Sequence, residues 1–165
     1  MSEKLKKLII IGGGIGTPEY LLPVAKQEIE KADCVIASER FLKNLTIKNG
    51  EVLGKISEFL SKLPERLKHE TIALIVSGDP LLYSLCRTIQ KKYPAIDLEI
   101  IPAISSLQVL GARFGLTMEN AVIISLHGRN YSIGKIAYTV SENFLTFFLC
   151  SAEQGVKEIA NILIL

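Results

Sequence analysis

The sequence predicts an α/β protein made of two α/β domains with mostly parallel sheets. Short apolar runs of strand length recur along the chain, and loops rich in glycine, serine or proline end them. Segments with apolar residues at helical spacing lie between these runs. Strands that alternate with helices are typical of βαβ units, in which the crossover helices cover a parallel sheet.

The first predicted domain covers residues 1–114. Leu8–Ile11 is a continuous apolar run closed by glycine, as expected of a strand buried on both faces. A helix is expected from Pro18 to Ile29, with Pro23 tolerated near its first turn. Further strands are expected at 33–37, 71–76 and 98–101, and further helices at 56–63 (ended by Pro64), 81–92 and 105–114.

The second predicted domain covers residues 115–165 and begins with a linker at 115–120. Strands are expected at 121–126 and 144–150, and helices at 133–140 and 151–165, the last with Ser151 as its N-cap. Two strands and two helices make a thin core for an independent domain. We therefore expect either that the protein dimerises through this region or that the chain is incomplete.

Composition excludes several classes of protein. The 165 residues are 48% hydrophobic and 22% charged, which is typical of a globular protein, and the net charge of +2 does not indicate a nucleic-acid partner. Cys34, Cys86 and Cys150 are far apart, so we expect buried free thiols in a reducing compartment and no metal site. The first apolar segment stops at glycines after Ile11, far short of a membrane span, so we expect a cytoplasmic protein.

Four loops follow predicted strands, and ligands bind at such strand ends in open α/β sheets. The loops are Gly12–Gly16, Ser77–Pro80, Ile101–Leu107 and Ser125–Asn130. The Ser-Gly-Asp-Pro loop is the most informative, because an apolar strand stops there abruptly. Asp79 and Pro80 either start a helix or contact a polar ligand.

The glycine loop leaves two alternatives open. Gly12 and Gly14 fit the first two positions of the dinucleotide-binding G-x-G-x-x-G pattern, but the third position falls on Thr17. Glu39 lies where an acid that binds a ribose would be expected, so an NAD(P)-binding oxidoreductase is one hypothesis. The other alternative is a purely structural glycine turn.

Serine and histidine side chains in these loops also have two interpretations. Ser105 and Ser106 either cap the following helix or bind a ligand. His127 is an acid, a base or a satisfied polar residue, while His69 lies in a charged stretch and is expected to be solvated.

Taken together and in this order, the four loops resemble the tetrapyrrole methylase family, whose members transfer a methyl group from S-adenosylmethionine. The resembling segments are Gly12–Leu22, Ser77–Tyr83, Ile101–Gln108 and Ser125–Arg129. The Pro-Ala-Ile-Ser-Ser-Leu-Gln and Ser-Leu-His-Gly-Arg stretches are most similar to the branch that methylates C5 of a precorrin or cobalt-precorrin in cobalamin biosynthesis. Sirohaem-type and diphthine-type relatives are the alternatives within the family.

The chain departs from the family pattern at several positions. Gly13 and Ile15 stand where a branched residue and a proline are common, and Leu21-Leu22 replaces the usual Leu-Thr. Family members also tend to run longer, with more strands in the second domain.

The resemblance implies that S-adenosylmethionine lies in a cleft between the two domains. Implied cofactor residues are Gly78, Asp79, Leu81, Leu82, Tyr83, Ser105, Ser106, Leu126, His127 and Gly128. Implied substrate residues are Gly12, Gly14 and Gly16, with Arg87, Arg113, Arg129 and also Arg40 as partners for the carboxylates of a corrinoid. Methyl transfer needs little acid or base chemistry, so no catalytic residue is assigned, and neither is the acceptor of the proton that must leave the macrocycle.

The same resemblance gives expectations about partners. We expect a homodimer and a pairing with the decarboxylase that methylates C15 in the same pathway. A non-catalytic partner of another pathway enzyme is the remaining hypothesis, because the second domain is short.

Overall fold

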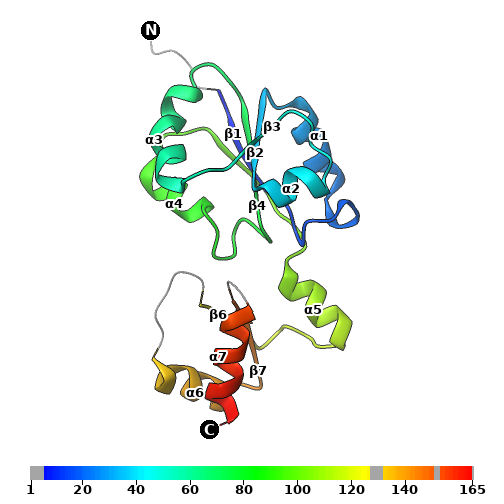
Figure 1. Cartoon of the computed structure of the whole chain (residues 1–165), viewed down its shortest axis with the longest axis vertical. Helices are drawn as coiled ribbons and strands as arrows, with labels where there is room; N and C mark the ends of the chain where they lie inside the picture. Colours follow the sequence, from blue (N-terminus) through cyan, green and yellow to red (C-terminus); the bar gives the residue numbers. More distant parts are fainter. Residues whose placement is uncertain (1–5, 127–131, 151–152, 165) are drawn as a thin grey trace. The chain divides into compact units, whose positions relative to one another are not determined.

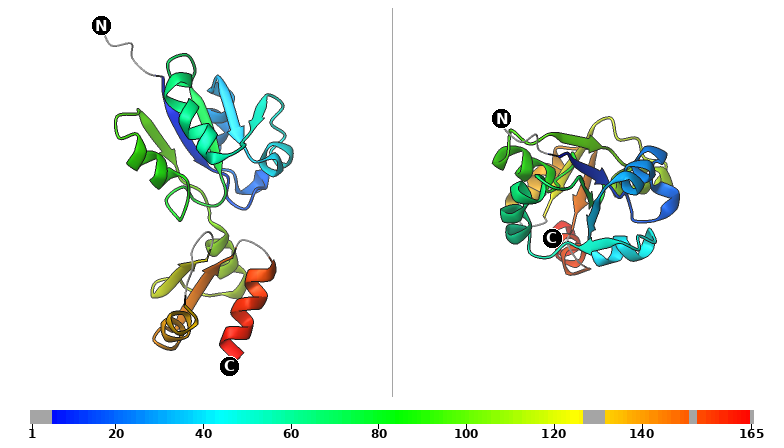
Figure 2. Two further views of the ribbon diagram at one scale, coloured as in Figure 1. Left: turned by 60° about the vertical axis from the view of Figure 1, so that its left-hand side comes forward. Right: turned by 90° about the horizontal axis from the view of Figure 1, so that it is seen from above.

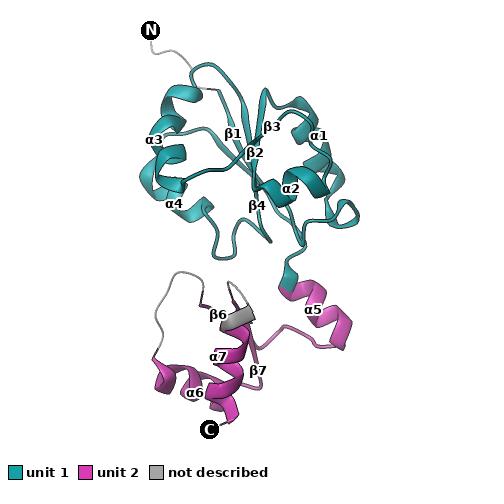
Figure 3. Cartoon of the chain, viewed as in Figure 1, with its two compact units in different colours: residues 1–106 teal, residues 107–165 magenta. Residues whose placement is uncertain are grey.

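The structure is a computed structural model that describes residues 6–126, 132–150 and 153–164. The chain divides into two compact units, residues 1–106 and residues 107–165 (Figure 3). The domain boundary after Phe114 and the cleft between the domains both stay predictions.

Unit 1 is built on a five-stranded parallel sheet with the strand order β3-β2-β4-β1-β5. The strands are β1 (Leu8–Gly12), β2 (Cys34–Ala37), β3 (Gly50–Val52), β4 (Ile72–Val76) and β5 (Leu98–Ile101). The helices are α1 (Pro23–Lys31), α2 (Glu39–Asn44), α3 (Ile56–Arg66) and α4 (Cys86–Lys92), and a 3₁₀ turn η1 (Pro18–Tyr20) precedes α1.

Helices cover both faces of this sheet, α1 and α2 on one side and α3 and α4 on the other (Figures 1 and 2). In β1, Leu8 and Ile10 belong to the cluster formed with α3 and α4, whereas Ile9 and Ile11 belong to the cluster formed with α1 and α2. All five residues of β1 and of β4 are buried, which explains why these strands are continuous apolar runs.

Three of the predicted helices have different bounds in the structure. The expected helix from Pro18 to Ile29 is a 3₁₀ turn followed by a helix that begins at Pro23, in the first helical position where a missing N–H costs nothing. The prediction that a helix begins at Leu81 is also wrong, because α4 begins at Cys86 and the preceding residues form turns.

Pro64 does not end its helix, because α3 continues to Arg66. A proline at this position leaves the carbonyl of Leu60, four residues earlier, without its helical donor. The hydroxyl of Tyr93 donates to that carbonyl instead. The Leu60 carbonyl, which loses its helical donor to Pro64, therefore gains one from a side chain just after α4.

Two elements of unit 1 are absent from the prediction, helix α2 and strand β3. Helix α2 has six residues and one buried side chain, Phe41. Strand β3 has three residues at the edge of the sheet, none of them buried. Both are too short and too exposed to give a clear hydrophobic period.

Unit 2 contains the parallel pair β6 (Ala121–Ser125) and β7 (Leu145–Leu149), with Ala121 opposite Leu145. Its helices are α5 (Ser106–Phe114, which starts at the unit boundary), α6 (Ile133–Ser141) and α7 (Glu153–Ile164). The Ser132 side chain caps α6 by accepting the Lys135 N–H at 3.3 Å. The predicted cap Ser151 lies outside the described residues. The predicted fold class, mostly parallel α/β, is confirmed.

Two further expectations concern the burial of the cysteines and a membrane-spanning helix. All three cysteines are free, Cys34 and Cys86 are buried, and Cys150 is only half-buried, so the prediction of burial is wrong for Cys150. Among the described residues, no helix combines the length and the apolar character that a membrane crossing requires.

Candidate functional site

Strands β4 and β1 are neighbours at the centre of the unit 1 sheet, and the chain leaves them in opposite directions. After β1 it crosses to β2, and after β4 it crosses to β5 on the other side. Such a point, where the strand order reverses, opens a crevice at the carboxyl ends of the strands, and ligands bind there in open α/β sheets. The glycine loop and the Ser-Gly-Asp-Pro loop both begin at this point.

The two loops are joined directly through their backbones. The Gly14 N–H donates to the Gly78 carbonyl at 3.2 Å, and the Gly78 N–H donates to the Gly14 carbonyl at 2.9 Å. Both residues have left-handed backbones, with φ of +56° for Gly14 and +69° for Gly78. Glycine is the residue that adopts this conformation without steric cost.

The third loop, residues 102–105, is attached to the same place. Asp79 accepts the Leu81 N–H through Oδ1 at 2.8 Å and the Ala103 N–H through Oδ2 at 2.9 Å. A Cβ atom on Gly12 would lie 2.4 Å from the Ala103 Cβ and 2.9 Å from the Gly78 carbonyl oxygen. The three loops are therefore packed so closely that Gly12 has no room for a side chain.

Two side chains of helix α2, Phe41 and Asn44, contact the glycine loop. A Cβ atom on Gly13 would lie 2.3 Å from the Phe41 ring, and the Asn44 side-chain amide donates to the Gly16 carbonyl at 3.1 Å. The Arg40 guanidinium lies over the same Phe41 ring, 4.8 Å from its centre. Sequence reasoning missed these supports, although Ser38 before an acid and the apolar Phe41 and Leu42 offered a weak helix signal.

Two apolar side chains of the loop after β4 are exposed. Leu81 is 66% exposed and Tyr83 is 46% exposed. Tyr83 also has a φ of +52°, which is a strained conformation for a bulky residue. Strain of this kind costs about 1–3 kcal/mol and is concentrated at binding sites.

The structure brings most of the sequence-predicted site residues of unit 1 together. Ser105 is buried at the end of the third loop, and Ser106 is exposed at the first position of α5. The residues on the three loops are Gly12, Gly14, Gly16, Gly78, Asp79, Leu81, Leu82, Tyr83 and Ser105. Their assignment to cofactor or substrate stays a prediction.

The remaining candidates lie elsewhere. Arg87 is exposed in the first turn of α4, and Arg113 is exposed in the last turn of α5, which belongs to unit 2. Leu126 follows β6 and is half-buried. The predicted residues His127, Gly128 and Arg129 lie outside the described residues, and His69 is exposed as expected.

The buried thiol of Cys86 lies near the site but is not activated as a nucleophile. Burial, and then the charge of Asp79, raise the pKa of the Cys86 thiol, which lies under the loop at the start of α4. A thiol with a raised pKa is a poor nucleophile. No group of three or more His, Cys, Asp or Glu side chains is arranged to hold a metal within residues 6–126, 132–150 and 153–164.

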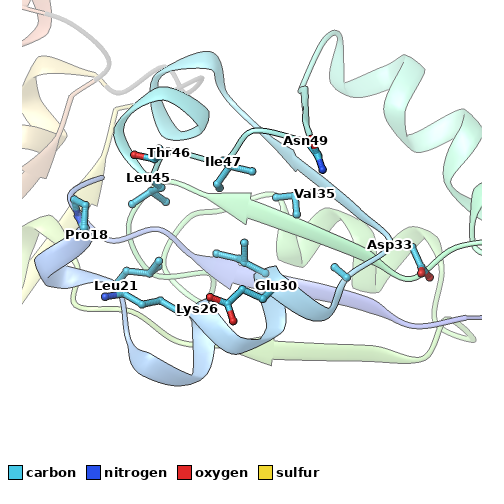
Figure 4. Close-up of a pocket in the computed structure, with 12 residues that line it drawn as sticks. Pro18, Leu21, Lys26, Glu30, Asp33, Val35, Leu45, Thr46, Ile47 and Asn49 are labelled. Atoms are coloured by element: carbon cyan, nitrogen blue, oxygen red, sulfur yellow. The ribbon is translucent and has the colours of Figure 1, made fainter.

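A separate pocket of about 440 Å³ lies in unit 1 between α1, β2 and the loop after α2 (Figure 4). Leu21, Val35, Leu45 and Ile47 give it an apolar lining, with the charged side chains of Lys26, Glu30 and Asp33 around it. It contains none of the predicted site residues.

Comparison with known proteins agrees with the geometry. The model of the tetrapyrrole (corrin/porphyrin) methylases matches residues 7–164. A probable cobalt-precorrin-7 C(5)-methyltransferase from Methanocaldococcus jannaschii is 31% identical over 95% of this chain and 76% of the relative. The cobalt-precorrin-7 C(5)-methyltransferase of Salmonella typhimurium is 30% identical over 92% of this chain and 77% of the relative.

Solved structures agree in fold. A precorrin-6Y methylase from Archaeoglobus fulgidus superposes with a TM-score of 0.64 at 24% identity, over 72% of this chain and 63% of that one. A cobalt-precorrin-4 methyltransferase superposes with a TM-score of 0.75 at 19% identity, over 96% of this chain and 74% of that one. The sequence-based resemblance is confirmed, and with it the expectation of a methyltransferase-type enzyme: this chain belongs to the tetrapyrrole methylase family.

Proposed function

We propose that this protein is an S-adenosylmethionine-dependent C-methyltransferase that acts on C5 of a precorrin or cobalt-precorrin in cobalamin biosynthesis. The observation that carries the proposal is the junction of three loops at the point where the order of the central strands reverses. The relatives named as C(5)-methyltransferases, at 31% and 30% identity, support the choice of position.

The residues present fit a cofactor that has a flat aromatic base and polar groups. A Cβ atom on Gly78 would meet nothing within 4 Å, so the space above this glycine is open, whereas the other side of the loop is packed. Leu81 and Tyr83 offer exposed apolar surface on the same loop, on which an aromatic base can stack. We propose that Gly78, Asp79, Leu81, Leu82, Tyr83, Ser105 and Ser106 hold S-adenosylmethionine, and the assignment of Leu126, His127 and Gly128 to the cofactor stays a prediction from the sequence.

The cofactor supplies a methyl group on a sulfonium, which is already activated for transfer to an electron-rich ring carbon. The protein's task is then to hold the carbon and the methyl group in line at near-attack distance. A rigid crevice without an activated nucleophile suits this task. The packing of Gly12 against Ala103 and Pro80 provides that rigidity.

Carboxylates around a corrinoid ring need cationic partners. Arg40 is exposed beside the glycine loop, and its position over Phe41 holds the guanidinium near that loop. Arginine binds carboxylates with two parallel hydrogen bonds. We propose Arg40 as a substrate residue together with Arg87, Arg113 and Arg129, and Gly12, Gly14 and Gly16 as the floor on the substrate side.

We further propose a cytoplasmic homodimer that works beside the decarboxylase that methylates C15. The relative from Sinorhizobium, which is named a decarboxylating precorrin-6Y C(5,15)-methyltransferase, supports this pairing: this chain matches only 38% of its length.

Thermal unfolding with added ligands tests the proposal. S-adenosylhomocysteine at about a hundred times its dissociation constant should stabilise the protein by about 2.7 kcal/mol, whereas NAD⁺ and NADP⁺ should leave the transition unchanged. The opposite preference would favour an oxidoreductase, for which Glu39, exposed in the first turn of α2, is the expected ribose ligand. Glu39→Ala should then abolish the effect of NAD⁺.

A further inference from the structure

Asp79 makes an unusual pair of contacts. One carboxylate oxygen accepts the Leu81 N–H at 2.8 Å, within its own loop. The other accepts the Ala103 N–H at 2.9 Å, from a loop 24 residues further along the chain. Hydrogen bonds from backbone N–H groups to an ionised carboxylate are among the strong ones in proteins.

The second contact joins the loop after β4 to the loop after β5. Among the described residues, no backbone–backbone hydrogen bond connects these two loops. The glycine loop is tied to the loop after β4 through Gly14 and Gly78, but the loop after β5 is tied to the loop after β4 through the Asp79 side chain. Packing supports this connection, since Ala103 and Pro80 both lie against Gly12. Ala103 is buried, so its N–H has no easy access to water in place of Asp79.

We propose that Asp79 is a positioning residue that couples the loop 77–85 to the loop 102–106, so that the two walls of the cofactor site keep one spacing. It acts through the Ala103 backbone. The effect on ligand affinity rests on the proposed function, whereas the effect on the loops does not. Asp79 itself transfers no proton in this role.

Asparagine in place of Asp79 changes one of the two carboxylate oxygens into a donor and leaves the other as an acceptor. In Asp79→Asn, one amide oxygen can still accept one of the two N–H groups, but the NH₂ group must face the other, donor against donor. The same unit also provides a matched control. Asp33 accepts the Thr71 N–H at 2.8 Å, beside the starts of β2 and β4 and therefore at the opposite end of these strands from the site. Asp33→Asn makes the same substitution there, and because only one N–H is involved, the amide oxygen can still accept it.

The test measures amide hydrogen exchange and S-adenosylhomocysteine binding on the full chain. In Asp79→Asn we expect the amides of 103–105 to exchange at least about tenfold faster and the dissociation constant to rise about tenfold or more. In Asp33→Asn we expect exchange at 103–105 to stay at the wild-type rate and the dissociation constant to stay within about twofold of the wild type. Asp79→Ser, whose hydroxyl reaches only the Leu81 N–H, removes the bond to Ala103 whichever way the asparagine amide turns, so it is measured alongside Asp79→Asn with the same expected result.

The outcomes separate the two proposals. Unchanged exchange at 103–105 in the Asp79 variants overturns the coupling. Faster exchange with unchanged affinity, or equal loss of affinity in Asp33→Asn, overturns the positioning role while the proposed function stands. If the wild type binds no S-adenosylhomocysteine, the proposed function fails, and exchange alone then decides whether Asp79 couples the loops.

Discussion

Gly12→Ala is the substitution that tests the packing of the three loops most sharply. The new methyl group would lie 2.4 Å from the Ala103 Cβ, 2.8 Å from the Pro80 Cδ and 2.9 Å from the Gly78 carbonyl oxygen. Ordinary contact begins near 3.4 Å, so at least one loop must move by about 1 Å. None of the three neighbours is the end of a flexible side chain.

Overpacking of this kind costs about 1–3 kcal/mol, and we expect the upper end because a ring and a backbone atom are both involved. For a chain of this size, 3 kcal/mol lowers the unfolding temperature by about 6–12 °C. Because the displaced atoms belong to the proposed cofactor site, affinity for S-adenosylhomocysteine should fall about tenfold or more. Circular dichroism melts and calorimetric titration measure the two effects.

Gly54→Ala is the matched control. A Cβ atom there would meet nothing within 4 Å, so we expect no destabilisation and unchanged affinity. If Gly12→Ala melts within about 2 °C of the wild type and binds the ligand equally well, the close packing of the loops is refuted.

Two further predictions concern the frame of unit 1. Tyr93→Phe removes the donor to the Leu60 carbonyl and should lower the free energy of unfolding in urea by about 1 kcal/mol. In a Pro64→Ala background this cost should be smaller, because residue 64 then supplies its own N–H to the same carbonyl. Equal costs in both backgrounds would contradict this account. Arg66 donates to both carboxylate oxygens of Glu51 and lowers its pKa below the usual 4.5, so the stabilisation from this pair is present above that value and is lost as the pH falls through the lowered pKa. Because Glu51 is largely exposed, Glu51→Gln should cost at most about 1 kcal/mol at pH 7. The difference from the wild type should close as the pH falls below 4.5 and through the lowered pKa of Glu51, and a difference that stays constant with pH would exclude the charge as its source.

The sequence was sufficient to predict the elements that are buried on both faces. Strands β1 and β4 are entirely buried, so nearly every position is apolar and the run is visible without an alignment. Strand β3 is an exposed edge, and α2 buries one side chain, so neither carries a period that single-sequence reasoning can detect. The helix beginning at Leu81 was wrong because Asp79 and Ser84 bond nearby backbone groups and form turns instead.

The site was predictable as a set of loops but not as an arrangement. Strand-end motifs indicate which loops meet at one edge of a parallel sheet. The contacts that join them, such as the bond from the Ala103 N–H to Asp79, connect residues far apart in the sequence and follow from strand order, which is a property of the whole fold. The support from Phe41 and Asn44 was missed for the same reason, together with the helix that carries it.

Methyl transfer from isotopically labelled S-adenosylmethionine to a purified precorrin or cobalt-precorrin tests the central claim most directly. Incubation with the full chain should move one labelled methyl group to C5 of the ring, located by nuclear magnetic resonance of the product. A product methylated at another ring position would contradict the assignment to C5. Tight binding of S-adenosylhomocysteine without transfer to any corrinoid would contradict the proposed activity.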